Sequence, residues 1–234
     1  MEFYKSIARY YDQIFPVNQK QVDFIRNGHI QFKVLDIACG NGGYLNRLSE
    51  YGFYGYGIDL DHNMINIANS KKTSDKVDFY EMNMTEIESF KEQSFDLIYS
   101  IGNSIVHLNT LEEIKKFVLS AFYLLKPRGE FILQIVNYDR ILDKQVSSLP
   151  TISNANLTMT REYTLHQGKI LFKTLLDVEG FAYENEVKLL PLRSDELISI
   201  LLEAGFARYE QYGDFVGSSF NRLESMSLVI KAFK

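Results

Sequence analysis

The sequence has one cysteine and only four histidines among its 234 residues. A single cysteine, Cys39, cannot form an intrachain disulfide, and the scattered histidines do not have the spacing of a metal-binding cluster. The chain lacks a dense block of lysine and arginine, and its formal net charge of -5 gives no general attraction to nucleic acid or anionic lipid. It also lacks a bilayer-spanning apolar run and a signal-peptide pattern. We therefore expect a cytoplasmic protein with a small-molecule partner, no metal, no nucleic acid and no membrane.

Hydrophobic residues make up 46% of the chain, which is enough to bury a substantial core. From residue 33 to residue 136, short apolar runs alternate with segments of helical period. Strands and helices that take turns need crossover connections, so the pattern predicts an α/β fold with a doubly wound, mostly parallel sheet of Rossmann-like type. The predicted strands are 33–37, 54–58, 77–80, 95–101 and 130–136, and the predicted helices are 42–51, 63–71 and 111–125.

The rhythm changes near residue 158, where two apolar runs flank the turn Gln167-Gly168 and predict an antiparallel hairpin with a third strand after it. This insertion is either a lid over the parallel strands or a plain extension of the sheet, since both have the same pattern. Ser194 is the expected N-cap of a later helix that Gly205 ends, and two final strands complete a seven-stranded sheet. The expected units are a helical cap at 1–30, a core at 31–150, the insertion at 151–192 and a closing segment at 193–234.

The stretch from Val34 to Leu45 reads VLDIACGNGGYL and places small residues directly after a predicted strand. Small residues let a ligand approach the backbone closely, and the start of the next helix offers unpaired N–H groups. The loop alone also fits a dinucleotide-binding fingerprint. Asp36 distinguishes a dinucleotide from a cationic ligand, because a carboxylate repels a diphosphate and attracts a ligand that carries an ammonium and a sulfonium. We infer that the ligand is S-adenosylmethionine.

A second carboxylate, Asp59, comes at the end of the next predicted strand. An acid at this place accepts hydrogen bonds from both ribose hydroxyls, and it serves a nicotinamide cofactor equally well. Capping of the following helix is the structural alternative for this residue. Asp59 therefore predicts that the ligand contains a nucleoside, but it does not distinguish S-adenosylmethionine from a nicotinamide cofactor.

Further along, the chain contains FYEMNM at 79–84, FDLIYSIGNSIVHL at 95–108 and LLKPRGE at 124–130. With the two segments above, these resemble in order the motifs of the class I S-adenosylmethionine-dependent methyltransferases. Two positions depart from the usual pattern: Ala38 replaces a glycine, and Asn83 replaces an aspartate while keeping a donor and an acceptor for adenine. The resemblance implies a Rossmann-like fold, methyl transfer, and a cofactor site made of Tyr11, Asp36, Ala38, Gly40, Asn41, Gly42, Asp59, Leu60, Asn83, Met84, Ile101, Gly102 and Asn103.

The segments GNSIVHL at 102–108 and VNYDRIL at 136–142 are similar to the glycine and sarcosine N-methyltransferase branch. In that branch an arginine precedes Asn-Tyr-Asp and pairs with the substrate carboxylate, a contact that Val136 cannot make. The difference argues against glycine itself as the substrate. Arg140 is either a replacement for that arginine or an exposed side chain at a helix start. The candidate substrate-binding residues are Tyr4, Asn137, Tyr138 and Arg140.

Methyl transfer from a sulfonium releases a neutral leaving group, so alignment and exclusion of water matter most. An amine acceptor needs a group that takes up its proton, and His107 and Tyr138 are the catalytic candidates. A packed, hydrogen-bonded role in positioning the loop is the alternative for His107. An oxygen acceptor needs a stronger base, which the sequence does not offer, so nitrogen is the preferred acceptor. Tyr11 resembles the tyrosine of an amino-terminal segment that folds over the cofactor, and we expect it to close the site.

Two other functions stay open at this stage. The first is a nicotinamide-dependent oxidoreductase, which Asp36 opposes, and the second is a non-catalytic module that binds the nucleoside. The fourth motif lacks the Pro-Pro-aromatic sequence of enzymes that methylate exocyclic base amines, which argues against nucleic acid. Cys39 has no identifiable base beside it and is expected to be inert. The sequence does not predict the oligomeric state.

Overall fold

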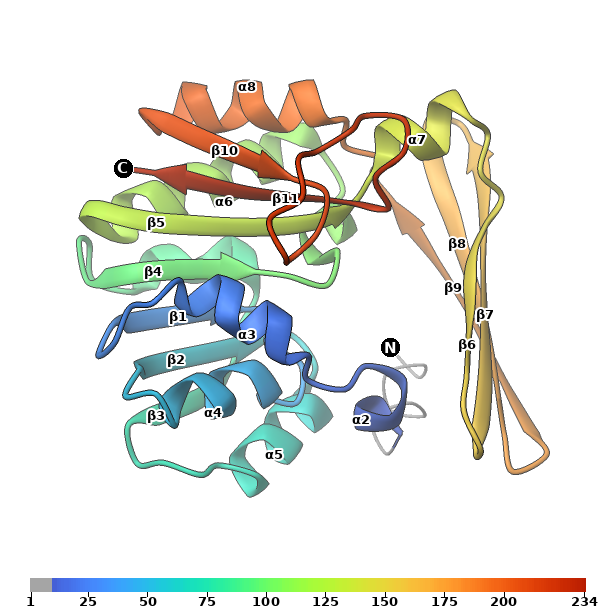
Figure 1. Ribbon diagram of the computed structural model, residues 1–234, viewed down its shortest axis with the longest axis horizontal. Helices are drawn as coiled ribbons and strands as arrows, with labels where there is room; N and C mark the ends of the chain where they lie inside the picture. Colours follow the sequence, from blue (N-terminus) through green and yellow to red (C-terminus); the bar gives the residue numbers. More distant parts are fainter. Residues whose placement is uncertain (1–9) are drawn as a thin grey trace.

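The computed structural model describes residues 10–234, which form two sheets joined through a shared core (Figure 1). The main sheet has seven strands in the order β10-β11-β5-β4-β1-β2-β3, and the second sheet has four in the order β6-β7-β8-β9. Strands β1 to β5 run parallel to one another, while β11 pairs antiparallel with β5 and with β10. The predicted seven-stranded, mostly parallel sheet is confirmed.

The elements of the parallel half match the predicted order closely. Its strands are β1 (Lys33–Ile37), β2 (Tyr54–Asp59), β3 (Val77–Glu81), β4 (Phe95–Ser100) and β5 (Leu125–Val136). Its helices are α2 (Tyr11–Ile14), α3 (Gln19–Arg26), α4 (Gly43–Ser49), α5 (His62–Ser70) and α6 (Leu111–Leu124), with short 3-10 helices η1 (Met84–Ser89) and η2 (Ser104–His107). The chain then continues with α7 (Tyr138–Asp143), α8 (Ser194–Ala204), β10 (Arg208–Tyr212) and β11 (Ser227–Phe233).

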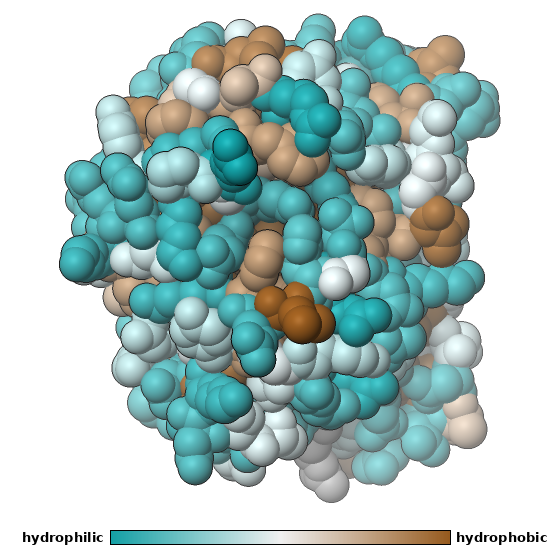
Figure 2. Space-filling model, turned by 60° about the vertical axis from the view of Figure 1, so that its left-hand side comes forward, coloured by the Kyte–Doolittle hydropathy of each residue, from teal (hydrophilic) through white to brown (hydrophobic). Residues whose placement is uncertain are grey.

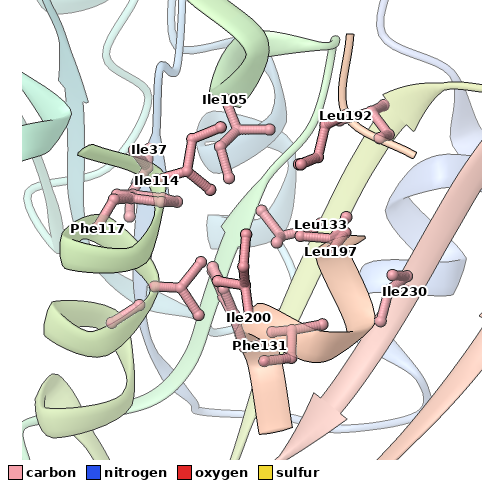
Figure 3. Close-up of a cluster of buried hydrophobic side chains, with 14 of the residues drawn as sticks. Ile37, Ile105, Ile114, Phe117, Phe131, Leu133, Leu192, Leu197, Ile200 and Ile230 are labelled. Carbon is pink, nitrogen blue, oxygen red and sulfur yellow. The ribbon is translucent and has the colours of Figure 1, made fainter. Parts of the chain in front are cut away.

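Buried side chains on both faces of the main sheet hold the helices in place. Leu35 and Ile37 face the side covered by α6 and α8, whereas Val34 faces the side covered by α3, α4 and α5. Figure 3 shows the first of these clusters, in which Phe131 and Leu133 of β5 meet Leu197 and Ile200 of α8. Because side chains alternate along a strand, Asp36 lies on the same face as Val34, next to Tyr99 of β4. The alternation thus places a charged group inside an apolar layer.

The second sheet contains β6 (Ser148–Ser153), β7 (Leu157–His166), β8 (Lys169–Val178) and β9 (Phe181–Leu189). The predicted hairpin and third strand are confirmed, but the expectation of three strands was wrong, because β6 adds a fourth on the outer side of β7. The sheet stands across the carboxyl ends of the parallel strands, with α2 between the two sheets (Figure 1). Ile14 of α2 packs against Leu157, Met159 and Leu176 of this sheet.

One predicted cap was wrong. Ser194 is the first residue of α8, and Arg193 takes the N-cap position, where its backbone N–H donates to Glu196 Oε2 at 2.8 Å. The backbone N–H of Ser194 instead donates to Asp139 Oδ2 at 3.0 Å, which fixes the start of α8 against α7. Gly205 ends the helix with a φ of 108°, as predicted.

The opposite end of the molecule, at the amino ends of the parallel strands, is mainly hydrophilic with isolated hydrophobic residues (Figure 2). Single apolar residues on a surface are ordinary and do not mark an interface. Within residues 10–234, no helix is both long enough and apolar enough to cross a membrane.

Candidate functional site

The turn between β1 and α4 adopts a backbone that favours glycine. Ala38, Gly40 and Gly42 have φ values of 61°, 55° and 75°, all in the left-handed region. Glycine reaches this region without strain, and alanine does so at a cost of about 1–2 kcal/mol. The replacement of the usual glycine by Ala38 therefore stores strain in the first residue of the turn.

The same turn has no room for side chains at its glycines. A Cβ on Gly42 would lie 2.6 Å from the ring of Phe79, and a Cβ on Gly40 would lie 2.9 Å from Tyr11 Oη. The first contact packs the turn against β3, and the second places the predicted closing tyrosine directly over the turn. A turn without side chains lets a ligand approach the backbone closely, and the Tyr11 ring covers the turn from the other side.

Asp36 is 3% exposed and lies in β1, one strand position before the turn begins. Tyr99 Oη donates a hydrogen bond of 2.8 Å to Asp36 Oδ2, while Oδ1 makes no hydrogen bond within residues 10–234. Burial raises the pKa of Asp36 to about 8, and the nearby Asp59 adds to the rise. A cation placed at Oδ1 would lower that pKa again. The carboxyl group therefore fits an ammonium ligand and does not fit a diphosphate.

Asp59 ties the turn to the next helix through both of its oxygens. The backbone N–H of Gly40 donates to Oδ2 at 2.8 Å, and the backbone N–H of Asp61 donates to Oδ1 at 2.9 Å. Each oxygen keeps a second acceptor position, which is what two ribose hydroxyls require. Burial raises the pKa of Asp59, and these backbone donors oppose the rise. The alternative role of helix cap falls to Asp61, whose side chain accepts from the N–H groups of Asn63 and Met64.

Three further residues predicted for the cofactor follow β2 and β3. Leu60 is 58% exposed, although it is a large apolar residue beside the ribose-binding acid. Asn83 caps η1 by accepting a hydrogen bond from Thr85 N at 3.0 Å, and within residues 10–234 its amide nitrogen has no acceptor. Met84 is half-buried and begins η1. The adenine-binding role of these three residues stays a prediction.

The segment after β4 forms the next wall. Ile101 is buried, whereas Gly102 is exposed, has a φ of 87° and donates its N–H to Gln134 Oε1 at 2.6 Å. Asn103 Nδ2 donates to Tyr138 Oη at 3.0 Å, and Asn103 Oδ1 accepts from Val136 N at 2.9 Å. The predicted Gly102-Asn103 pair is thereby fixed to the end of β5.

His107 ends η2 and has an exposed imidazole that makes no hydrogen bond in the described part of the chain. Surrounding protein lowers its pKa through desolvation. Next to it, Leu190 N donates to the carbonyl of Val106 at 2.8 Å, which anchors the second sheet beside His107. The geometry differs from that of a packed, hydrogen-bonded histidine.

Two residues predicted to meet the substrate are buried instead. Asn137 is 1% exposed, and its Nδ2 donates to the carbonyls of Arg222 and Ser225 at 2.9 Å each, while its Oδ1 accepts from Arg140 N. Tyr138 is 1% exposed, and burial holds its pKa well above the ordinary range. These contacts engage the Asn137 amide and place the Tyr138 hydroxyl against Asn103, and the roles proposed for both residues in substrate binding and catalysis stay predictions. Arg140 is half-buried and makes no ion pair with any residue in 10–234.

The short helix α2 connects the turn to the second sheet. Asn41 Nδ2 donates to Asp12 Oδ1 at 2.5 Å, and Lys71, the C-cap of α5, pairs with the same carboxylate. Asn41 is 3% exposed, so this contact fixes the buried side of the turn. Tyr4, which was also predicted to meet the substrate, lies outside the described residues.

Cys39 is buried, and burial raises the pKa of its thiol well above the ordinary range. Such a thiol is a poor nucleophile. Among residues 10–234 no three His, Cys, Asp or Glu side chains come together in a way that could hold a metal ion.

Three positioning residues were missed by the sequence analysis: Tyr99, Gln134 and Asp12. Tyr99 could have been found from strand register, because β1 and β4 are neighbours and Asp36 pairs with it. Gln134 is the polar residue within the apolar run of β5, which was a visible signal. The partner of Asp12 depends on tertiary packing, for which the sequence offers no pattern.

The amino-acid sequence of the chain is similar to those of known methyltransferases. Residues 35–133 match the model described as a methyltransferase domain. A glycine/sarcosine N-methyltransferase of Aphanothece halophytica is 29% identical over 78% of this chain and 69% of its own length. A putative methyltransferase of Geobacillus is 31% identical over 56% of this chain, and a phosphoethanolamine N-methyltransferase of Plasmodium falciparum is 38% identical over 43%. The chain spans 57% of the Geobacillus protein and 38% of the Plasmodium protein.

Solved structures share the fold over nearly the whole chain. An S-adenosylmethionine-dependent methyltransferase of Clostridium acetobutylicum has a TM-score of 0.80 at 17% identity and covers 98% of both chains. The CcbJ methyltransferase of Streptomyces caelestis has a TM-score of 0.81 at 18% identity, over 97% of this chain and 95% of its own. Residues 35–133 therefore match a methyltransferase domain, and the chain has the fold of S-adenosylmethionine-dependent methyltransferases.

Proposed function

We propose that the chain transfers the methyl group of S-adenosylmethionine to the nitrogen of a small-molecule amine. The observation that carries the proposal is the pair of carboxyl groups around the glycine-rich turn. Asp36 offers an acceptor to an ammonium group, and Asp59 offers two acceptor positions to a ribose. A nucleoside that carries an amino acid needs both.

The residues around the turn fit such a cofactor. Asp36 would hold the ammonium group, Asp59 the ribose, and Leu60 with Met84 the faces of the adenine. The amide nitrogen of Asn83 would donate to an adenine ring nitrogen, because its oxygen already caps η1. Tyr11 would cover the turn from above, since its hydroxyl lies against Gly40. Each assignment is part of the proposal.

The chemistry asks little of the protein beyond alignment and proton removal. Bound S-adenosylmethionine supplies a methyl group on a sulfonium, whose sulfur keeps the electron pair of the broken S–C bond and leaves as a neutral thioether. An acceptor amine must arrive with a free lone pair, which forms the new N–C bond, and its surplus proton must then go to a base. His107 can take this proton because its lowered pKa leaves the imidazole neutral at pH 7. An alcohol would need a much stronger base.

The relatives support nitrogen as the acceptor atom. Proteins named glycine/sarcosine N-methyltransferase match 78% of this chain at 25–29% identity, and the Plasmodium relative is named for phosphoethanolamine. Val136 stands where the glycine-specific branch has an arginine, so we propose an amine other than glycine.

An acceptor screen tests the proposal. The purified chain is incubated with S-adenosylmethionine and matched pairs of amines and alcohols of equal carbon skeleton, and S-adenosylhomocysteine formation is measured. We expect turnover with amines and none with the alcohols. In His107→Gln, kcat should fall by about 10²-fold.

Turnover confined to alcohols would contradict the choice of nitrogen. Tight binding of S-adenosylmethionine with no turnover of any acceptor would support a non-catalytic binding module instead. A control variant, His166→Gln, changes an exposed histidine at the hairpin turn of the second sheet and should leave kcat unchanged.

A further inference from the structure

The inner face of the second sheet is apolar at both ends and polar in the middle. Along β7, Leu157, Met159 and Tyr163 are buried and point toward the rest of the molecule. Leu157 and Met159 pack with α2, whereas Tyr163 joins the core around Tyr138. Arg161 belongs to the same alternating set and lies between the two apolar groups. A cation therefore occupies the centre of an otherwise apolar surface.

Polar residues on the next two strands of the sheet lie in register with Arg161. Arg161 pairs with Thr174 of β8, and Thr174 pairs with Asn185 of β9. Thr174 is 1% exposed and Asn185 is half-buried, so both lie on the inner face. The side-chain amide of Asn185 makes no hydrogen bond within residues 10–234. The row supplies a guanidinium and an amide on the side that faces the carboxyl ends of the parallel strands (Figure 1).

Arg161 lacks the partners that a guanidinium normally has. Its Nη2 donates to the carbonyl of Pro150 at 2.6 Å, but its Nε is buried and has no acceptor in the described part of the chain. No carboxylate there forms an ion pair with it, and desolvation lowers its pKa. A buried donor without an acceptor destabilises the folded chain, and more so when the group is charged. An anionic ligand would remove that cost.

The neighbours of Arg161 connect it to the reacting centre. Tyr163, two residues along β7, packs in the same core as Tyr138, whose hydroxyl positions Asn103 after β4. The second sheet is also joined to η2 beside His107 through Leu190 and Val106. His107 and the second sheet therefore lie at the same end of the main sheet, the end where the parallel strands finish.

We propose that Arg161 binds an anionic group of the methyl acceptor, a carboxylate or a phosphate, so that the substrate is an amine carrying a negative charge. This inference rests on the proposed function and adds the substrate class to it. The guanidinium provides paired N–H donors that match either anion. Asn185 supplies a neutral hydrogen-bonding group across the row.

The Arg161 Nε–H resonance in a ¹⁵N-labelled sample gives a direct test, and its loss in Arg161→Lys assigns it. Sodium acetate and sodium phosphate are titrated in turn, with chloride at equal ionic strength as the control, both with and without S-adenosylhomocysteine. We expect a saturable shift with at least one of the two anions, and the stronger response identifies carboxylate or phosphate. Arg161→Gln should weaken binding of that anion by at least about tenfold.

The control variant Arg128→Gln changes an exposed arginine at the opposite end of the main sheet and should bind the anion as the unmodified chain does. The absence of a saturable shift with either anion would overturn the inference, as would equal anion affinity in Arg161→Gln. Melting curves of both variants check that they are folded. Binding of S-adenosylhomocysteine in the same samples is a separate readout, because its failure would contradict the proposed function and not the role of Arg161.

Discussion

Asp36 shows how one buried carboxyl group can couple cofactor binding to pH. In the free protein its pKa is raised to about 8, so below that pH the group carries a proton. Pairing with an ammonium group requires the charged form, so binding at pH 6–7 must release this proton. The affinity for S-adenosylhomocysteine should therefore rise with pH, by up to about tenfold per unit, until the pH reaches the pKa.

Calorimetric titrations between pH 6 and 8 in two buffers of different ionisation enthalpy measure both the affinity and the released proton. Asp36→Asn should bind more weakly and show no such rise, because the amide does not titrate. A pH-independent affinity in the unmodified chain would contradict this account of Asp36.

Ala38 is a second residue whose environment makes a definite prediction. Its φ of 61° strains an alanine by about 1–2 kcal/mol, and glycine would remove the strain while losing about 0.5–1 kcal/mol through the greater freedom of the unfolded chain. Ala38→Gly should thus stabilise the protein by about 0.5 kcal/mol, measured by urea unfolding. Ala121→Gly, in the last turn of α6, should instead destabilise it by about 1 kcal/mol or more. Destabilisation by Ala38→Gly would show that the turn does not strain alanine.

At the scale of elements, the attachment of the short helix α2 to the turn makes a definite prediction. It has four residues and is held to the turn by Asp12, through Asn41 and Lys71. We expect Asp12→Ala to speed amide hydrogen exchange in residues 10–15 and to raise the KM for S-adenosylmethionine more than it lowers kcat. The matched variant Asp23→Ala, which changes an aspartate on α3, should leave both unchanged. Unaltered exchange in Asp12→Ala would mean that the apolar contacts with the second sheet alone hold α2.

The sequence predicted the regular elements well and the irregular ones poorly. Periodicity identified the main sheet because its strands bury both faces and its helices bury one. Strand β6 was missed because Pro150 interrupts it, which proline can do on an edge strand where no partner needs its missing N–H. The N-cap of α8 was misplaced because the N–H of Ser194 is bound by the distant Asp139, a contact that local sequence does not encode.

At the scale of the whole molecule, the cofactor side of the site was easier to predict from the sequence than the acceptor side. The cofactor side comes from motifs in which backbone geometry and side chain act together, such as Asp59 on the N–H of Gly40, and the structure brings these residues to one edge. On the acceptor side, the resemblance of residues 137–139 to the Asn-Tyr-Asp motif identified the residue types. It did not indicate which way their side chains point. Asn137 and Tyr138 point inward, where they fix the loop before β11 and Asn103. Arg161 lies on a sheet whose register decides which side chains face inward.

The central claim of this account is that Asp36 recognises the cationic amino-acid part of the cofactor. The most direct measurement compares the affinity of S-adenosylhomocysteine with that of 5′-methylthioadenosine, which lacks that part, in the unmodified chain and in Asp36→Asn. We predict that the unmodified chain prefers S-adenosylhomocysteine at pH 8 and that Asp36→Asn loses at least about tenfold of this preference. An equal preference in both proteins would contradict the claim, because Asp36 would then contribute nothing to recognition of the ammonium group.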